Sequence, residues 1–206
     1  MRFVKAIIDF VMDILETVTF VGSIFIVIYL FIMQPNQVKG ASMVPTFQDG
    51  EYIFTSKVTY KFREIQRGDI VVFKSPRNPD LEYIKRVIGL PGDAVRISSG
   101  TVYVNEKQLD EPYISDKTNL WEGGFISENE TVIVPTGKIW VMGDNRPRSS
   151  DSRDFGPVEI TSLIGHVFYR YFPPERMGVI KNQFHFSGEP QSLLPHQNRE
   201  LPLVLQ

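Results

Sequence analysis

The chain has 206 residues, of which 42% are hydrophobic and 12% aromatic. This size suits one well-packed domain with an anchor and leaves little room for a second large domain. A net charge of −2 gives no basic footprint for nucleic acid, and the absence of cysteine excludes disulfides, thiolate nucleophiles and cysteine-based metal sites.

The first predicted element is a membrane anchor. Residues 18–33 are apolar, and no charged residue lies between Glu16 and Lys39. This run covers about 24 Å as a helix, so it would cross a bilayer upright or borrow apolar length from residues 10–15. A cleavable signal peptide is the alternative, but its apolar core is usually shorter and an Ala-x-Ala-like site should follow it. We therefore expect residues 17–35 to form a retained, single-pass anchor in the plasma membrane.

The charges near the N-terminus predict the orientation of this anchor. Arg2, Lys5 and the terminal amine favour a cytoplasmic N-terminal segment over residues 1–16. The domain that follows would then lie on the extracytoplasmic side.

Beyond the anchor, short apolar runs separated by Gly, Pro and Asn predict strands. The predicted strands cover residues 51–56, 69–74, 81–89, 93–98, 101–105, 130–134, 138–142 and 163–172. Short spacing without long crossovers favours a mainly antiparallel β fold, either a curled sheet or a partly open barrel. We expect this domain to span residues 36–186, with 106–136 as an excursion from the core and 187–206 as a loose tail.

Two residues carry the predicted chemistry. Ser42 lies nine residues beyond Met33, so it stays within about 30 Å of the membrane. Lys85 follows 43 residues later, and in a strand it would share an apolar face with Tyr83 and Val87. Burial without a counter-charge lowers the pKa of a lysine, and a neutral lysine can activate a serine hydroxyl. Taken singly, each residue also fits an ordinary surface lysine and an ordinary turn serine.

Four motifs follow the anchor in order: GASMVPT at 40–46, GDIVVF at 68–73, YIKRVIGLPGD at 83–93 and GDNRPRSSDSR at 143–153. This arrangement closely resembles type I signal peptidases, the membrane-anchored Ser/Lys endopeptidases that release exported proteins from their signal peptides. The resemblance covers approximately residues 18–170, and it implies the signal-peptidase type of β fold.

The resemblance implies roles for individual residues. Ser42 would be the nucleophile, with its backbone amide in the oxyanion hole, and Lys85 the general base. Gly40 stands where many members have a serine that completes the hole, so a backbone donor or water must substitute. Ser149 matches a serine that orients the lysine.

Four charged residues of the last motif match family residues that lie behind the catalytic side chains and hold them in place: Asp144, Arg146, Asp151 and Arg153. Calcium binding by these acids is the alternative, but the arginines among them already supply cations. We expect neither a metal nor another cofactor.

The substrate would be an extended peptide paired with strand edges, so that alternate side chains enter pockets. In the family these pockets take small residues, which gives the Ala-x-Ala preference. Val38, Phe47, Tyr83 and Ile84 match or neighbour the lining positions, although position 47 is more often leucine. The implied partners are preproteins and the lipid bilayer, with the protein itself a monomer.

Other functions remain as alternatives. A Ser/His/Asp enzyme would need His166, His185 or His196. A self-cleaving repressor-type Ser/Lys peptidase shares the chemistry but would lack the anchor. A membrane-tethered, non-enzymatic β-domain acting as adaptor or scaffold predicts that Ser42 and Lys85 can be exchanged freely.

Overall fold

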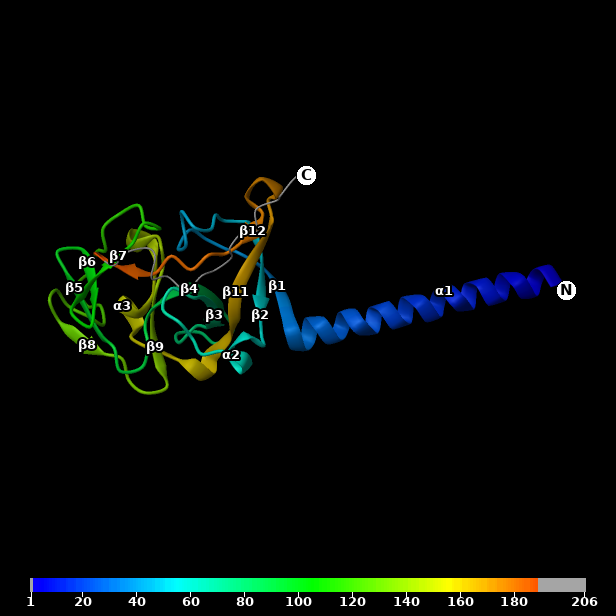
Figure 1. Ribbon diagram of the computed structural model, residues 1–206, viewed down its shortest axis with the longest axis horizontal. Helices are drawn as coiled ribbons and strands as arrows, with labels where there is room; N and C mark the ends of the chain where they lie inside the picture. Colours follow the sequence, from blue (N-terminus) through cyan, green and yellow to red (C-terminus); the bar gives the residue numbers. More distant parts are fainter. Residues whose placement is uncertain (1, 189–206) are drawn as a thin grey trace, which may run out of the picture.

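The computed structural model describes residues 2–188 and begins with a long helix, α1 (Arg2–Val27), that a π-helical segment, η1 (Ile28–Ile32), continues. Figure 1 shows α1 projecting from the β domain, and none of its residues is buried. Its most apolar window has a mean hydropathy of 1.9, and it is the one helix among residues 2–188 long and apolar enough to cross a membrane. By length, the helix can therefore serve as an anchor.

The helical segment differs at both ends from the predicted span. It begins at Arg2, so the predicted N-terminal segment is helical, and it ends at Ile32. Met33–Gln37 form a strand instead, with Met33 paired to Ser56. Pro35 explains the change, because a proline disfavours helical backbone at the residue before it.

The domain contains a large antiparallel sheet in the order β1-β2-β11-β3-β4-β9-β10, with β12 paired to β11. Its strands are β1 (Met33–Gln37), β2 (Tyr52–Ser56), β3 (Ile70–Lys74), β4 (Glu82–Gly89), β9 (Lys138–Met142), β10 (Val158–Glu159), β11 (Leu163–Phe172) and β12 (Gly178–Val179).

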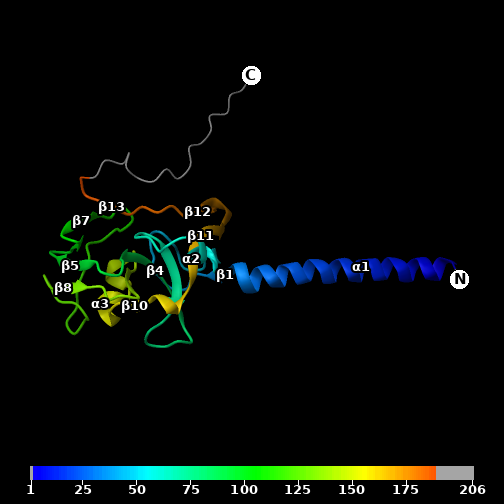
Figure 2. The ribbon, with the colours of Figure 1, turned by 60° about the horizontal axis from the view of Figure 1, so that its bottom comes forward.

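A second sheet has the order β13-β7-β6-β5-β8. It comprises β5 (Ala94–Ser98), β6 (Thr101–Val104), β7 (Lys107–Asp110), β8 (Thr131–Ile133) and β13 (His185–Phe186). Figures 1 and 2 both show it at the end of the domain far from α1. Short helical segments complete the fold: α2 (Thr59–Phe62), η2 (Arg146–Arg148), α3 (Ser152–Phe155), η3 (Ile160–Ser162) and η4 (Pro174–Arg176).

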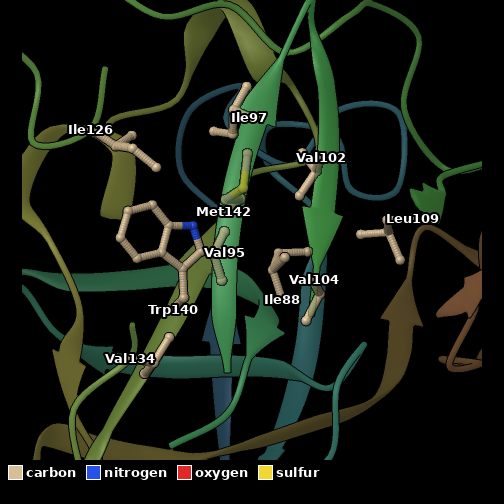
Figure 3. Packing of buried hydrophobic residues seen from close by; sticks show 10 residues of the cluster. All are labelled: Ile88, Val95, Ile97, Val102, Val104, Leu109, Ile126, Val134, Trp140 and Met142. Carbon is tan, nitrogen blue, oxygen red and sulfur yellow. The ribbon is translucent and has the colours of Figure 1, made fainter. Parts of the chain in front are cut away.

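Side-chain patterning explains these sheets. The apolar run Ile70–Lys74 lies in the middle of the large sheet because both of its faces are covered. Ile70 and Val72 pack on one face, while Val71 and Phe73 pack on the other. A third cluster lies around Trp140 and joins β4 and β9 to the second sheet (Figure 3).

The predicted mainly antiparallel β fold is confirmed, and each of the eight predicted strands is present within one residue of its expected ends. The predicted strands at 93–98 and 101–105 form a hairpin, with positive φ at Ser99 and Gly100 in its turn. The prediction missed β7, which pairs with β6 inside the expected 106–136 excursion. It also missed β1, β10, β12 and β13. Of the predicted tail, only Ser187 and Gly188 are among the described residues, and they form a turn.

Candidate active site

Ser42 and Lys85, 43 residues apart in the sequence, meet in space. Ser42 lies on the loop between β1 and β2, and Lys85 lies in β4 opposite Val71 of β3. Lys85 Nζ lies 2.9 Å from Ser42 Oγ and donates a second hydrogen bond of 2.9 Å to the Ile84 carbonyl. The two atoms are therefore within proton-transfer distance.

The surroundings of Lys85 favour its neutral form. Its side chain is 4% exposed, and it shares a strand face with Tyr83 and Val87 as predicted. Burial lowers the pKa of Lys85 to about 8, although the negative charges of Asp151 and Asp144 act in the opposite direction. Neither carboxylate forms an ion pair with it, so desolvation decides the direction.

The loop that carries Ser42 is held by buried side chains and by hydrogen bonds. Met43 and Phe47 are almost wholly buried. Gly40 has a φ of +84°, a backbone conformation that favours glycine, and its N–H donates to Asp49 Oδ1 at 2.7 Å. Asn145 also binds this loop and was not predicted as a site residue.

Ser149 lies close to the nucleophile but does not form the expected hydrogen bond with Lys85. It is buried beside Gly143, where an added Cβ would lie 2.2 Å from Ser149 Oγ and 2.5 Å from the Ser42 carbonyl oxygen. No hydrogen bond joins Ser149 to Lys85, whose partners are Ser42 and the Ile84 carbonyl. The orienting bond is thus supplied by backbone in this structure.

The four charged residues of the last motif are all buried. Arg153 forms two hydrogen bonds with Asp151, of 2.9 Å and 2.8 Å, and Asp151 also accepts the Gly143 N–H at 2.9 Å. Burial raises the pKa of Asp151, but the hydrogen bonds and charge of Arg153 outweigh it and hold the pKa below its ordinary value. These contacts fix the turn that packs against the Ser42 loop.

Two ion-pair partners of these residues, Arg86 and Glu111, were not predicted from the sequence. Arg86 is paired with Asp144, through Nε at 2.8 Å and Nη2 at 2.7 Å, and both side chains are inaccessible to solvent. Arg146 is paired with Glu111, which comes from the predicted excursion. The only hint in the sequence was that Arg86, next to Lys85, must face the opposite side of β4. Arginines therefore pair with Asp144 and Asp151, the carboxylates that the calcium alternative requires.

A groove of about 640 Å³ runs past the Ser42–Lys85 pair. Its walls come from the end of β1 and the start of β4. Its lining includes three of the four predicted substrate-binding residues, Val38, Tyr83 and Ile84. Phe47 is not part of the lining, which corrects the prediction: it is wholly buried and packs in the core with Val38 and Ile53.

Both walls of the groove present strand edges. β1 pairs only with β2, and β9 reaches β4 no further than Arg86. Within residues 2–188, the groove-facing edges of Met33–Gln37 and of residues 82–85 have no strand partner. An extended peptide can therefore add between them.

The histidines do not meet Ser42. His166 Nε2 lies 3.7 Å from Asp69, and His185 Nε2 lies 2.7 Å from Asp110. His196 is outside the described residues. Lys85 is thus the basic side chain in contact with the serine.

Comparisons with known proteins find a family model and curated relatives that match most of the chain. The family model described as "Signal peptidase, peptidase S26" matches residues 11–172. Signal peptidase IB of Staphylococcus aureus (strain COL) is 37% identical over 175 residues, which cover 78% of this chain and 91% of the relative. Signal peptidase I of Bacillus caldolyticus is 42% identical over 151 residues, which cover 70% and 82%.

A crystal structure of a signal peptidase I from Enterococcus faecalis V583 is also similar, with 39% sequence identity and a TM-score of 0.43. The match covers 50% of this chain and 97% of that one. The family model covers well over half of the chain, and the curated relatives are more than 30% identical across most of it. The chain therefore belongs to the signal peptidase family, peptidase S26.

Proposed function

We propose that this protein is a membrane-anchored endopeptidase that removes signal peptides from exported preproteins, with Ser42 as nucleophile and Lys85 as general base. The observation that carries the proposal is the 2.9 Å contact between Lys85 Nζ and Ser42 Oγ at the floor of a peptide-sized groove. A buried lysine with a pKa of about 8 is substantially neutral at a mildly alkaline pH, so it can accept the serine proton.

In the proposed reaction, Lys85 accepts and returns a proton in each of two steps, acylation and deacylation of Ser42. Lys85 Nζ takes the proton from Ser42 Oγ as the oxygen attacks the scissile carbonyl carbon. The lysine then gives that proton to the leaving amine, which releases the mature protein and leaves an acyl-enzyme. Lys85 then takes a proton from water, whose oxygen attacks the ester carbonyl carbon. As the bond between that carbon and Ser42 Oγ breaks, Lys85 returns the proton to Ser42 Oγ, and the signal peptide leaves as a carboxylic acid that ionises in solvent.

The groove supports an extended substrate with small residues at alternate positions. Backbone hydrogen bonds to the free edges of β1 and β4 would hold the peptide, while alternate side chains face the groove lining near Val38, Ile84 and Tyr83. We propose that this geometry produces an Ala-x-Ala preference. A bulky residue just before the cut should abolish cleavage, and a bulky residue at the intervening position should have little effect.

The helix α1 supports the proposed location. It would anchor the protein in the plasma membrane with the catalytic domain on the extracytoplasmic side, where exported preproteins emerge. A substrate held in the same membrane meets the groove at a raised effective concentration.

The test uses the full-length protein purified in detergent. It is incubated with a preprotein, and the mass of the new N-terminus is measured. Wild type should make one defined cut, and Ser42→Ala should make none while remaining folded. Ser162→Ala is the matched control and should be fully active, because within residues 2–188 the hydroxyl that it removes bonds only the Glu159 carbonyl. Uncut preprotein with wild type would reject the proposal in favour of a tethered adaptor. Turnover by Ser42→Ala above a few per cent would instead remove Ser42 as the nucleophile.

A further inference from the structure

Asn145 makes two hydrogen bonds to the backbone beside the nucleophile. Its backbone N–H donates to the Ser42 carbonyl at 3.0 Å. Its side-chain Nδ2 donates to the Ala41 carbonyl at 2.9 Å. One residue therefore holds two consecutive carbonyl groups, those of Ala41 and Ser42, on the same side of the loop.

The second of these bonds, together with a 3.2 Å hydrogen bond from the Val44 N–H to the same Ala41 carbonyl, sets the direction of the Ser42 N–H. The Ala41 carbonyl and the Ser42 N–H belong to one peptide unit, and in a trans peptide the two groups point in opposite directions. Because the carbonyl points at Asn145, the N–H points away from it. Ser42 lines the groove and Asn145 does not, so this direction leads into the groove.

The Ser42 N–H is also available to a substrate. It donates no hydrogen bond to any residue between 2 and 188, whereas the neighbouring carbonyl is fully engaged. An unengaged backbone donor beside the attacking oxygen is the geometry that stabilises a tetrahedral oxyanion.

Asn145 is itself fixed from both sides. Asp144 is held by Arg86 and Arg146 by Glu111; Arg86, Asp144 and Arg146 are buried, and the Glu111 side chain is 7% exposed. The ion pairs do not touch the reacting atoms. They act on the reaction indirectly, because they restrain the residues on both sides of Asn145 and so hold its backbone in place.

From this geometry we infer that Asn145 is a positioning residue that aims the Ser42 N–H at the developing oxyanion. The inference rests on the proposed peptidase function and extends it to a residue that does not contact the substrate. Losing an oxyanion donor outright lowers kcat about 10²- to 10³-fold, so a loosened donor should lower kcat about 10- to 100-fold.

The test compares two variants of Asn145 that remove the side-chain donor in different ways. Asn145→Leu keeps the approximate size of the side chain but removes the donor, and Asn145→Asp replaces the donor with a charge. Asn129→Asp, on an exposed turn, is the control for added charge and should cleave like wild type. Steady-state cleavage of a signal-peptide substrate is measured in detergent, together with binding of a peptide aldehyde that forms a tetrahedral adduct with the serine.

Both Asn145 variants should lose kcat while KM changes less than about threefold, and aldehyde affinity should fall in parallel with kcat/KM. In Asn145→Leu the apparent pKa of the rate should stay near that of wild type, because this variant adds no charge and Asn145 forms no hydrogen bond with Lys85. A merely structural role would instead change KM and the pH profile together. The inference is wrong if Asn145→Leu keeps kcat within twofold of wild type, or if only the aspartate variant is impaired. Failure of wild type to cleave would overturn the proposed function itself.

Discussion

Lys85 Nζ lies 2.9 Å from Ser42 Oγ, and the same amine donates to the carbonyl of its own neighbour, Ile84. The strand that carries Lys85 thus also orients its amine. Ser149, which was expected to orient Lys85, forms no hydrogen bond with it in this structure.

The first prediction concerns pH. Below a pH of about 8, Lys85 is mostly protonated and cannot accept the serine proton, so kcat/KM should rise with pH and level off above this value. The measurement is kcat/KM on a soluble peptide between pH 6 and 10. A limb centred near the ordinary lysine pKa of 10.5 would show that burial does not activate Lys85.

The second prediction concerns the base itself. Lys85→Arg keeps a positive charge, but the guanidinium remains protonated at any workable pH, so cleavage should be lost. Lys74→Arg, an exposed position on the neighbouring strand β3, is the control and should retain wild-type turnover. Substantial activity of purified Lys85→Arg, free of host peptidase, would return Lys85 to a structural role.

The third prediction concerns the buried ion pair behind the site. Asp144→Asn leaves the Arg86 charge buried without its partner, which should lower the free energy of unfolding by about 3–5 kcal/mol. Glu159→Gln breaks a pair with Lys138 whose side chains are 36% and 56% exposed, so its effect should stay below about 1 kcal/mol. Denaturant unfolding of both variants compares the two, and equal effects would contradict the difference in burial.

The fourth prediction concerns the packing between Gly143 and the nucleophile. A methyl group on Gly143 would lie 2.5 Å from the Ser42 carbonyl oxygen, a backbone atom that cannot rotate away. Gly143→Ala should displace Ser42 and lower kcat at least about tenfold, since displacements near 1 Å can cost about 100-fold. Gly178→Ala is the control, because its added Cβ meets nothing within 4 Å. Normal kcat in Gly143→Ala would show that the loop can move without loss.

Much of the fold followed from local patterns. Strands such as Ile70–Lys74 and Lys138–Met142 were predictable because a continuous apolar run must be buried on both faces of a sheet. β1 was not predictable, since its sequence MQPNQ is polar and contains a proline. Its strand conformation depends on hydrogen bonds to Tyr52–Ser56, which no local pattern reveals.

For the site, the sequence by itself determined which residues carry the proposed chemistry: a serine after an apolar anchor, a lysine on an apolar strand face, and the charged turn that follows. Only the tertiary structure decided how these parts act on one another. It placed Phe47 in the core, paired Arg86 with Asp144, and set Asn145 against the Ser42 loop. Alternation along a strand fixes which side chains share a face. The partner that each face meets depends on how the sheet curls and where the loops pack, and these follow from burying the whole core at once.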